Sequence, residues 1–502
     1  MPVAWALEEM DHAAFEDERL NARLTKLLSD LGERPQLSIP AACGGHAETA
    51  AAYRFFDNES VTQELVLQPH FEKTRERVAE HPVVLFVQDT TELDFTRPHQ
   101  QVAGAGPLKD TSQRGALLHP LEAITPDGTP LGAVWAQMWT REDEAVPLSR
   151  KQKRRLRWTS PLEVKESFRW LQGLRAAREV AQQMPQTTCV CIGDSESDIY
   201  ELYMEPRGTT PVHWLIRAAQ DRLIVSPEKG VSPDESSLIS GECAAARQIR
   251  AAALASAVLF RKEISVRGRD QKIRCKTGSR DQPRESRQAQ VEVRATTLQL
   301  RPPSRAHVEL IPVTVNVVLV SEIDPPAGEG PVEWILITTL PIGTIEQVRQ
   351  IVQYYAMRFM IEVLFRVLKS GCRVEERRFE QIDRLLPCVA VYLIVAWRTL
   401  MVCRLSRSSC DLDCEAIFEP AEWKSVWRVL KNEPLPATPP KLAPMVRLLA
   451  QLGGYVNHPG RHDPPGPQTI WLGLQRTRDL AWAWNTFGPG AAEPPPGSRA
   501  CV

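Results

Sequence analysis

Three carboxylates of this 502-residue chain occur where a protein could use them for metal-dependent chemistry. Asp89 and Asp194 each follow, by two residues, an apolar run typical of a buried strand, VVLFV and TTCVCI. Glu362 lies within a long, mostly apolar helical pattern. Their oxygens suit Mg²⁺, with Mn²⁺ as a plausible substitute, and two such ions about 4 Å apart support phosphodiester transfer. Each acid taken alone also fits an ordinary cap or turn residue.

The helical pattern around Glu362 predicts one long helix from Thr344 to Lys369, starting with a capping box and ending before Gly371. At about 100° per residue, one stripe of this helix carries four polar side chains, Tyr355, Arg358, Glu362 and Lys369. Unpaired buried charge is costly, so a buried stripe of this kind needs partners. The alternative is a surface stripe in which Glu362 pairs with Arg366.

The elements that must position these residues alternate in an informative order. Strand-like runs and helical patterns follow one another as β-β-β-α-β-α-β, with an aspartate after the first and the fourth strand. This is the order of the ribonuclease H type of mixed sheet, so we expect an α/β fold. The predicted strands are Val83–Val87, Gly115–Ile124, Leu131–Trp139, Thr187–Ile192 and Val212–Arg217, and the predicted helices are Ser160–Met184 and a short one from Asp194 to Tyr203.

Positive charge is concentrated in two places, although the whole chain has a net charge of only −1. Residues 261–305 contain 13 Lys and Arg against five Asp and Glu, within a β-rich insertion predicted at about 225–340. A basic insertion in a sheet with acidic edges indicates a bound polyanion. Residues 150–157 hold six basic residues in eight, which also fits a solvated face.

Other features limit the class of protein. Eleven cysteines without regular spacing indicate reduced thiols, and the N-terminus lacks a signal-peptide pattern, so we expect a cytoplasmic protein. The apolar stretch Leu385–Trp397 is too short to cross a membrane. Zinc is disfavoured because Cys403, Cys410 and Cys414 include no CxxC pair and have no nearby histidine. No phosphate-binding glycine loop indicates ATP-driven chemistry.

Several motifs, in order along nearly the whole chain, match one known family. The match includes RLNARL and AYRFFDN near the N-terminus, QDTT at 88–91, RG-x3-H at 114–119, D-x-E-x-D-I at 194–199, EIDPPAGEGPVEW at 322–334, Y-x2-R-x3-E-x6-K at 355–369 and LLAQLGGYVN at 448–457. The chain therefore resembles the bacterial DDE transposases of the insertion-sequence-four group, which carry this Y-R-E-K signature and include the transposase of transposon five.

The resemblance implies a role for each matching residue. It makes Asp89, Asp194 and Glu362 the catalytic, metal-binding triad. Tyr355, Arg358 and Lys369 would contact DNA phosphates near the cut, and Trp334 would pack in the pocket for a flipped base. Arg217 and His119 would lie near the site and bind DNA. One departure is Ser195, which replaces an arginine common in the family and removes a phosphate contact rather than a metal ligand.

The resemblance also implies an organisation and an activity. We expect a helical DNA-binding domain at 1–70, a ribonuclease H-like catalytic domain at 71–372, a helical dimerisation domain at 373–490 and a disordered tail at 491–502. Periodicity alone leaves the N-terminal module open as a dimerisation or packing module. The expected activity is cut-and-paste transposition by a nucleoid-associated homodimer that binds double-stranded transposon ends and target DNA. The alternatives are an inactive DNA-binding relic that inhibits transposition, or a structure-specific nuclease.

Overall fold

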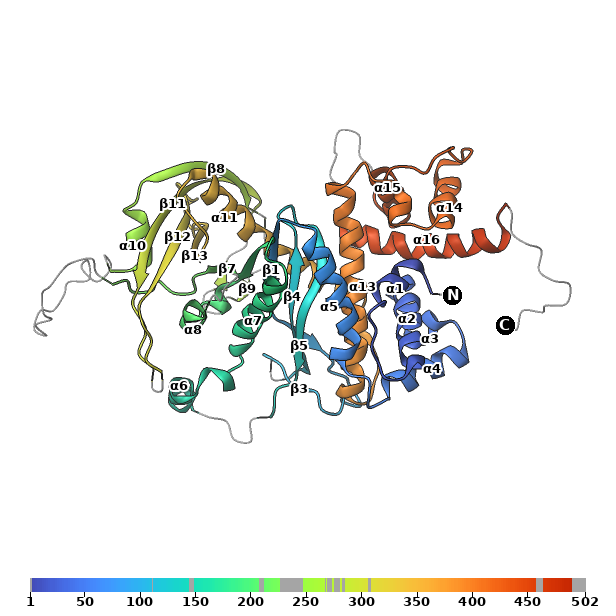
Figure 1. Cartoon of the computed structure of the whole chain (residues 1–502), viewed down its shortest axis with the longest axis horizontal. Coiled ribbons are helices and arrows are strands. Elements are labelled where there is room, and N and C mark those ends of the chain that lie inside the picture. Colours follow the sequence, from blue (N-terminus) through green and yellow to red (C-terminus); the bar gives the residue numbers. More distant parts are fainter. Residues whose placement is uncertain are drawn as a thin grey trace, which may run out of the picture. The chain divides into compact units, whose positions relative to one another are not determined.

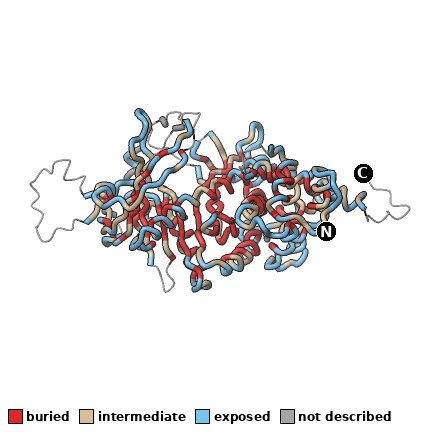
Figure 2. Tube along the Cα trace, turned by 90° about the horizontal axis from the view of Figure 1, so that it is seen from above, coloured by how far each residue is buried: buried red, intermediate tan, exposed pale blue. Residues whose placement is uncertain are grey.

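A computed structural model of the chain divides it into two compact units, each with its own core (Figure 1). Unit 1 comprises Met1–His81, Thr90–Asp143 and Phe359–Val502, and unit 2 comprises Pro82–Asp89 and Glu144–Arg358. Buried segments are enclosed by exposed ones (Figure 2). The described residues are 2–110, 112–143, 149–206, 212–225, 247–266, 268, 273–274, 280–281, 285–305, 308–456 and 464–489.

The sheet of unit 2 combines parallel and antiparallel strands. Strand β1 (Val83–Gln88) pairs in parallel with β6 (Thr188–Gly193), and β6 pairs in parallel with β7 (His213–Arg217). The sheet continues in antiparallel pairing through β13 (Glu333–Thr338), β12 (Val313–Glu322), β11 (Arg287–Leu300) and β8 (Val258–Val266). Helix α7 (Phe168–Gln183) packs on β1 and β6. Residues Val84–Val87 of β1 are apolar on both faces of the strand and are completely buried.

The remaining elements of unit 2 are short, apart from two helices. Part of the predicted insertion, including residues 226–246, lies outside the described residues. The elements not yet given are α6 (Arg150–Thr159), η1 (Leu162–Val164), η2 (Ser195–Ser197), α8 (Tyr200–Met204), α10 (Ile249–Leu254), β9 (Ile273–Arg274), β10 (Arg280–Asp281) and α11 (Ile345–Met357).

Unit 1 packs helices from both ends of the chain around four antiparallel strands. Helix α5 (Gln63–Ala79) lies on strand β5 (Pro130–Trp139), and α13 (Ile382–Ser408) packs against both. Gly132 in β5 has a φ of +134°, and a Cβ atom there would lie 2.1 Å from Thr74 Oγ1, so only glycine permits this approach of α5.

The helices are α1 (Ala4–Glu9), α2 (Glu18–Glu33), α3 (Ile39–Cys43), α4 (His46–Phe56), α5 (Gln63–Ala79), α12 (Phe359–Arg366), η3 (Val367–Gly371), η4 (Val374–Glu376), α13 (Ile382–Ser408), η5 (Cys414–Ala416), α14 (Pro420–Lys431), α15 (Leu442–Leu452) and α16 (Pro467–Phe487). The strands are β2 (Thr91–Asp94), β3 (Gly106–Pro107), β4 (Arg114–Ile124) and β5 (Pro130–Trp139).

The predicted fold class is confirmed: an α/β, ribonuclease H-like mixed sheet with a β-rich insertion and helical regions at both ends. Two helix predictions were wrong in their extent. The helix expected from Thr344 to Lys369 is interrupted at Arg358 and ends in a π-helical turn. The helix expected from Ser160 begins only at Phe168, because Pro161 instead caps a short 3₁₀ turn.

Helix α13 is longer than the apolar stretch expected there. It is the one helix within the described part of the chain that is long and apolar enough to cross a membrane, and 83% of its most apolar window is buried inside the protein. Trp397 of this helix donates a hydrogen bond to the Pro130 carbonyl over 3.2 Å. These contacts are those of a core helix.

Candidate active site

Asp89 and Asp194 occupy equivalent positions at one edge of the unit 2 sheet. In the parallel pair β1–β6, Val87 lies opposite Ile192. Asp89 comes two residues after Val87, and Asp194 comes two residues after Ile192. Because carboxyl ends of neighbouring parallel strands meet at the same edge, the two aspartates are neighbours there. The apolar runs in the sequence correctly predicted that both residues follow a buried strand.

The backbone around these aspartates is fixed by tight packing. Gln88, only 1% exposed, donates from Nε2 to the Trp170 carbonyl over 3.3 Å and lies 3.2 Å from Cys191 Sγ. A Cβ atom on Gly173 would lie 2.2 Å from Gln88 Oε1, so α7 sits directly against the end of β1. Asp194 Oδ1 accepts the Glu196 backbone N–H over 2.7 Å and thereby caps η2.

Arg358 supplies a cation to this edge from within unit 2. Its NH1 atom donates to Asp89 Oδ2 over 3.1 Å, and both side chains are about 18% exposed. An ion pair this sheltered is screened less than a surface pair. The family resemblance assigns Arg358 to DNA phosphate and Asp89 to the metal, and these two side chains are in direct contact.

Tyr355, Trp334 and Arg217 form a second group in unit 2. Tyr355 is 4% exposed, and its ring centroid lies 5.2 Å from that of Trp334 in an edge-to-face arrangement. Burial raises the pKa of Tyr355 above its usual value, against the opposing effects of Arg358 and of Arg217, which hydrogen-bonds its side chain. The phenol therefore stays neutral near pH 7 and can act as a hydrogen-bond donor.

Asp198 holds the loop that follows Arg217, a role that the sequence reasoning missed. Its Oδ2 accepts the backbone N–H groups of Ala219 and Gln220 over 2.7 and 3.3 Å. Its Oδ1 accepts from the Tyr203 hydroxyl over 2.5 Å and from Arg222 Nε over 2.6 Å. The signal was present, because Asp198 belongs to the D-x-E-x-D motif at 194–198.

Unit 1 carries Glu362 and Lys369. Glu362 is half-buried on α12. Lys369 lies in the π-helical turn, where Cys372 N–H bonds to the Val367 carbonyl over 2.8 Å, a spacing of five residues. Its ammonium donates to the Glu92 carbonyl and lies 3.3 Å from Glu375 Oε1. This turn changes the helical phase, so the even 100° spacing assumed from sequence does not extend to Lys369.

His119 is enclosed in unit 1. The residue is 0% exposed, its Nδ1 lies 2.8 Å from Thr90 Oγ1, and its ring meets Trp135 edge-on at 5.9 Å. Thr90 directly follows Asp89 in the chain. These contacts favour a positioning role for His119, so its assignment to DNA contact stays a prediction.

The donor chemistry fits a hard divalent cation. Carboxylate oxygens on adjacent strand ends are ligands that Mg²⁺ and Mn²⁺ accept. No group of three His, Cys, Asp or Glu side chains arranged to hold a metal ion is found among the described residues. For zinc, Cys403 and Cys414 are buried in the C-terminal apolar cluster, and burial raises the pKa of the Cys414 thiol to about 12. A thiol of that kind is a poor metal ligand.

Comparison with known families accounts for most of the chain. Three protein-family models match it in the order of their domains: Transposase DNA-binding at residues 2–61, Transposase DDE domain at 171–386 and Transposase Tn5 dimerisation domain at 394–481. The chain belongs to the DDE transposases. Within that class it is a Tn5-like member, because the dimerisation domain that it matches is the one named for Tn5.

A solved structure gives a weaker match. The cryo-EM structure of a piggyBac transposase synaptic complex with hairpin DNA is similar over 81% of this chain and 73% of that chain. The sequence identity is 10% and the TM-score is 0.34, which is too low a similarity to carry any argument about this chain.

Proposed function

We propose that this transposase moves its element by a cut-and-paste route in which Asp89, Asp194 and Glu362 together bind two divalent cations, Mg²⁺ or Mn²⁺. The observation that carries the proposal is the shared position of Asp89 and Asp194 at the edge of the β1–β6 pair. When bound, such ions would supply activation of the attacking oxygen and stabilisation of the leaving one.

The side chains around the carboxylates have separate tasks in this proposal. Arg358 and Lys369 bind phosphates of the strand being cut. Arg358 lies beside Asp89 of the triad, and Lys369 lies beside Glu375. Tyr355 donates its phenolic hydrogen to a phosphate oxygen. Trp334, packed edge-on against Tyr355, offers a ring on which an extruded base can stack.

The proposed order of reaction is the one that the resemblance to cut-and-paste transposases implies. Water first cleaves one strand at each transposon end and frees a 3′-hydroxyl. That hydroxyl attacks the opposite strand to form a hairpin, which releases the flanking DNA. A second water opens the hairpin, and the 3′-hydroxyl then attacks target DNA.

Two ends must be joined while one chain carries one triad, so a homodimer on double-stranded transposon ends is proposed. Support comes from the matched DNA-binding and dimerisation domains. A cytoplasmic, nucleoid-associated location is proposed with it. The domain bounds 1–70, 71–372 and 373–490 remain proposals as well, and the predicted disordered tail at 491–502 lies outside the described residues.

The test uses purified protein, Mg²⁺ and DNA carrying the inverted repeats that bracket the gene. We expect nicked, hairpin and joined products in succession on denaturing gels. Glu362→Ala should abolish all three while retaining end binding in a gel-shift assay. Glu376→Ala, which removes an exposed acid near η4, is the matched control and should cleave normally.

The remaining outcomes separate the alternatives. Nicking without any hairpin or joined product would identify a structure-specific nuclease instead. End binding without any cleavage would identify an inactive relic. Cleavage by Glu362→Ala would overturn the assignment of the triad.

A further inference from the structure

One carboxylate beside the turn that carries Lys369 has no role in the proposed reaction. Glu375 lies in η4, and its Oε1 atom lies 3.3 Å from the Lys369 ammonium. The chain between the two residues passes through Arg373, whose φ of +51° is in the left-handed region. A non-glycine residue keeps that conformation only where its surroundings hold it. The folded chain therefore fixes Glu375 next to Lys369.

A backbone donor holds the Glu375 carboxylate independently of the lysine. Oε1 accepts the N–H of Asp94, the last residue of β2, over 2.9 Å. Strand β2 lies at the edge of its sheet, so N–H groups on its outer side need partners from outside the sheet. Glu375 supplies one such partner, and its side chain is 30% exposed. The position of this carboxylate therefore does not depend on Lys369.

The backbone that carries Glu375 is held as well. Arg377, which ends η4, is only 4% exposed and donates to the Pro35 carbonyl over 2.6 Å and to the Leu37 carbonyl. Its guanidinium lies 4.4 Å from the centre of the Tyr392 ring. A buried cation is costly unless such partners hold it, so these contacts fix the end of η4. Glu375 therefore lies on a rigid segment.

Lys369 has a second acceptor on the same strand. Its ammonium donates to the Glu92 carbonyl of β2, and its side chain is 31% exposed. An ammonium has three N–H donors, so a phosphate oxygen can bind alongside the Glu92 carbonyl and the Glu375 carboxylate. A lysine that is already fixed loses less conformational entropy when it binds a ligand. The arrangement thus presents a fixed cation that solvent, and hence DNA, can reach.

Three other carboxylates near this turn have polar partners of their own. They are Glu92 with Arg141, Asp94 with Gln113, and Glu376 with Arg373. Within the described part of the chain, Glu375 is the carboxylate that forms an ion pair with Lys369. The charge of the ammonium is therefore balanced by Glu375.

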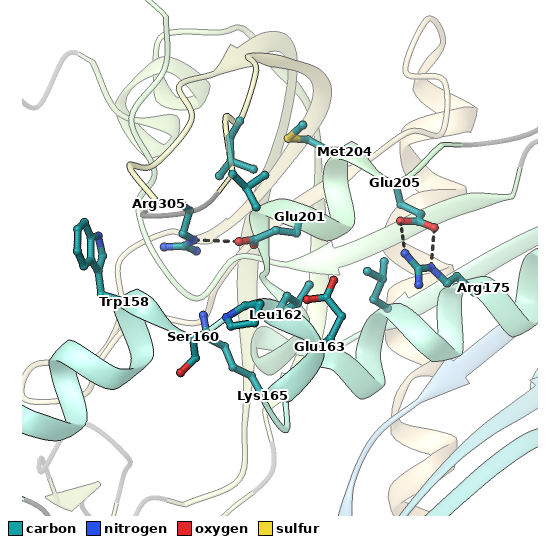
Figure 3. A pocket seen from close by; sticks show the side chains of 14 residues that line it. Trp158, Ser160, Leu162, Glu163, Lys165, Arg175, Glu201, Met204, Glu205 and Arg305 are labelled. Atoms are coloured by element: carbon teal, nitrogen blue, oxygen red, sulfur yellow. Dashed lines mark hydrogen bonds and ion pairs between the residues drawn. The ribbon is translucent and has the colours of Figure 1, made fainter.

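Some ion pairs of this chain serve to join two elements. Two of them line a cavity in unit 2 and link the region of α8 to other segments (Figure 3): Glu201 with Arg305, and Glu205 with Arg175. The pair of Lys369 with Glu375 adds no such link, because each residue already has its own hydrogen bond to β2. What this pair determines is where the ammonium lies.

We propose that Glu375 is a positioning residue, which holds the Lys369 ammonium where a phosphate oxygen of the strand being cut meets it. The proposal rests on the proposed function, in which Lys369 binds that phosphate. Glu375 acts through Lys369 and does not contact DNA, since a carboxylate repels a phosphate. A competing role makes the opposite prediction: if Glu375 only blocked Lys369, its removal would strengthen end binding and speed up cleavage.

The first test separates end binding from the rate of cutting. Glu375→Ala should lower the rate of the first cut about tenfold at saturating end DNA and Mg²⁺, because Lys369 is no longer held in place. The dissociation constant for the ends, measured by gel shift, should change by less than about twofold. Glu376→Ala removes the neighbouring acid, which is 60% exposed and pairs with Arg373, and should leave both quantities unchanged.

Two further variants distinguish positioning from a loss of structure. Glu375→Gln keeps an oxygen that can accept from the Asp94 N–H and from Lys369, so it should recover most of the lost rate. In the Lys369→Ala background, Glu375→Ala should not slow the residual cutting further, because no ammonium remains to be held. A structural defect would instead slow that background as well, and would lower the melting temperature of the single variant.

A second test needs neither DNA nor metal. Acylation of Lys369 by an N-hydroxysuccinimide ester, followed by mass spectrometry, should be several-fold faster in Glu375→Ala, because the side chain has lost one of its two partners. Lys431, exposed at the end of α14, is the internal control and should react equally in both proteins.

Equal acylation of Lys369 in the two proteins would overturn the proposal. So would a Glu375→Ala variant that binds ends more tightly and cuts them faster, since Glu375 would then be a competitor. A failure of the unmodified chain to cut would count against the proposed function instead, and acylation would still decide whether Glu375 holds Lys369.

Discussion

Arg358 NH1 lies 3.1 Å from Asp89 Oδ2, so the guanidinium occupies an oxygen that a divalent cation would need. The Asp89 carboxylate cannot fully bind both the Arg358 guanidinium and a metal ion at the same time. In the proposed mechanism Arg358 must turn from Asp89 toward a DNA phosphate when the metal binds. The ion pair then neutralises the acidic edge until DNA and metal arrive together.

Replacing Arg358 by alanine should separate metal binding from catalysis. We expect Arg358→Ala to bind Mn²⁺ several-fold more tightly, because the competing cation is gone. Cleavage of transposon ends should fall about tenfold to a hundredfold, because a phosphate contact made during the reaction is lost. Isothermal titration with Mn²⁺ and a cleavage time course measure the two effects.

Arg366→Ala is the matched control for that experiment, since Arg366 is exposed on α12. It should change neither quantity. If Arg358→Ala instead lost Mn²⁺ affinity together with cleavage, Arg358 would be organising the metal site rather than competing with it.

Removing the charge of Asp198 should destabilise unit 2. The side chain of Asp198 is fully buried, and that of its partner Arg222 is 11% exposed. Asp198→Asn leaves that cation without its counter-charge, at a cost of about 3 kcal/mol in the free energy of unfolding. Urea unfolding followed by circular dichroism measures the change.

Arg222→Met in the Asp198→Asn background is the control for this prediction. It removes the stranded cation and should recover part of the lost stability. A double variant no more stable than Asp198→Asn would show that the hydrogen bonds to Ala219 and Gln220, rather than the ion pair, carry the effect.

The sequence predicted those features that depend on local composition. The runs before Asp89 and Asp194 are strands because β-branched residues fill a buried parallel pair. The ion pair from Arg358 to Asp89 joins residues 269 positions apart, and no local pattern encodes it. The π-helical turn also packs against a residue far along the chain, because a Cβ atom on Gly371 would lie 2.9 Å from the Trp471 ring. Helical periodicity in the sequence carries no information about such a distant contact.

Glu122 should make the stability of unit 1 depend on pH. It is 2% exposed on β4, neither of its oxygens has a hydrogen-bond partner, and burial raises its pKa from 4.5 to about 8. A raised pKa means that its contribution to stability is fully present below pH 4.5 and is lost as pH rises through 8. Within that window the free energy of unfolding should fall by up to about 1.4 kcal/mol per pH unit.

Substituting Glu122 by methionine removes the buried carboxyl at similar volume. Glu122→Met should therefore stabilise the protein, and the gain should be larger at pH 8 than at pH 5. Thermal unfolding at both pH values measures this difference. Glu64→Gln, an exposed substitution on α5, should show no such difference. An equal gain at both pH values would mean that Glu122 does not titrate in this range.

Trp334 should matter for the hairpin step and not for the first cut. Its ring rests edge-on against Tyr355 at 5.2 Å and is only partly buried, so an extruded base can stack on it. Trp334→Ala loses a stacking contact of about 1–3 kcal/mol, so nicked DNA should accumulate while hairpin formation slows about tenfold or more. Tyr355→Phe is the matched control: it keeps the ring on which Trp334 packs and loses only the hydroxyl that bonds Arg217. That variant should weaken end cleavage without changing the ratio of hairpin to nick, as measured on denaturing gels. If Trp334→Ala slowed the first nick as much as the hairpin, its role would be to support Tyr355 rather than to hold a base.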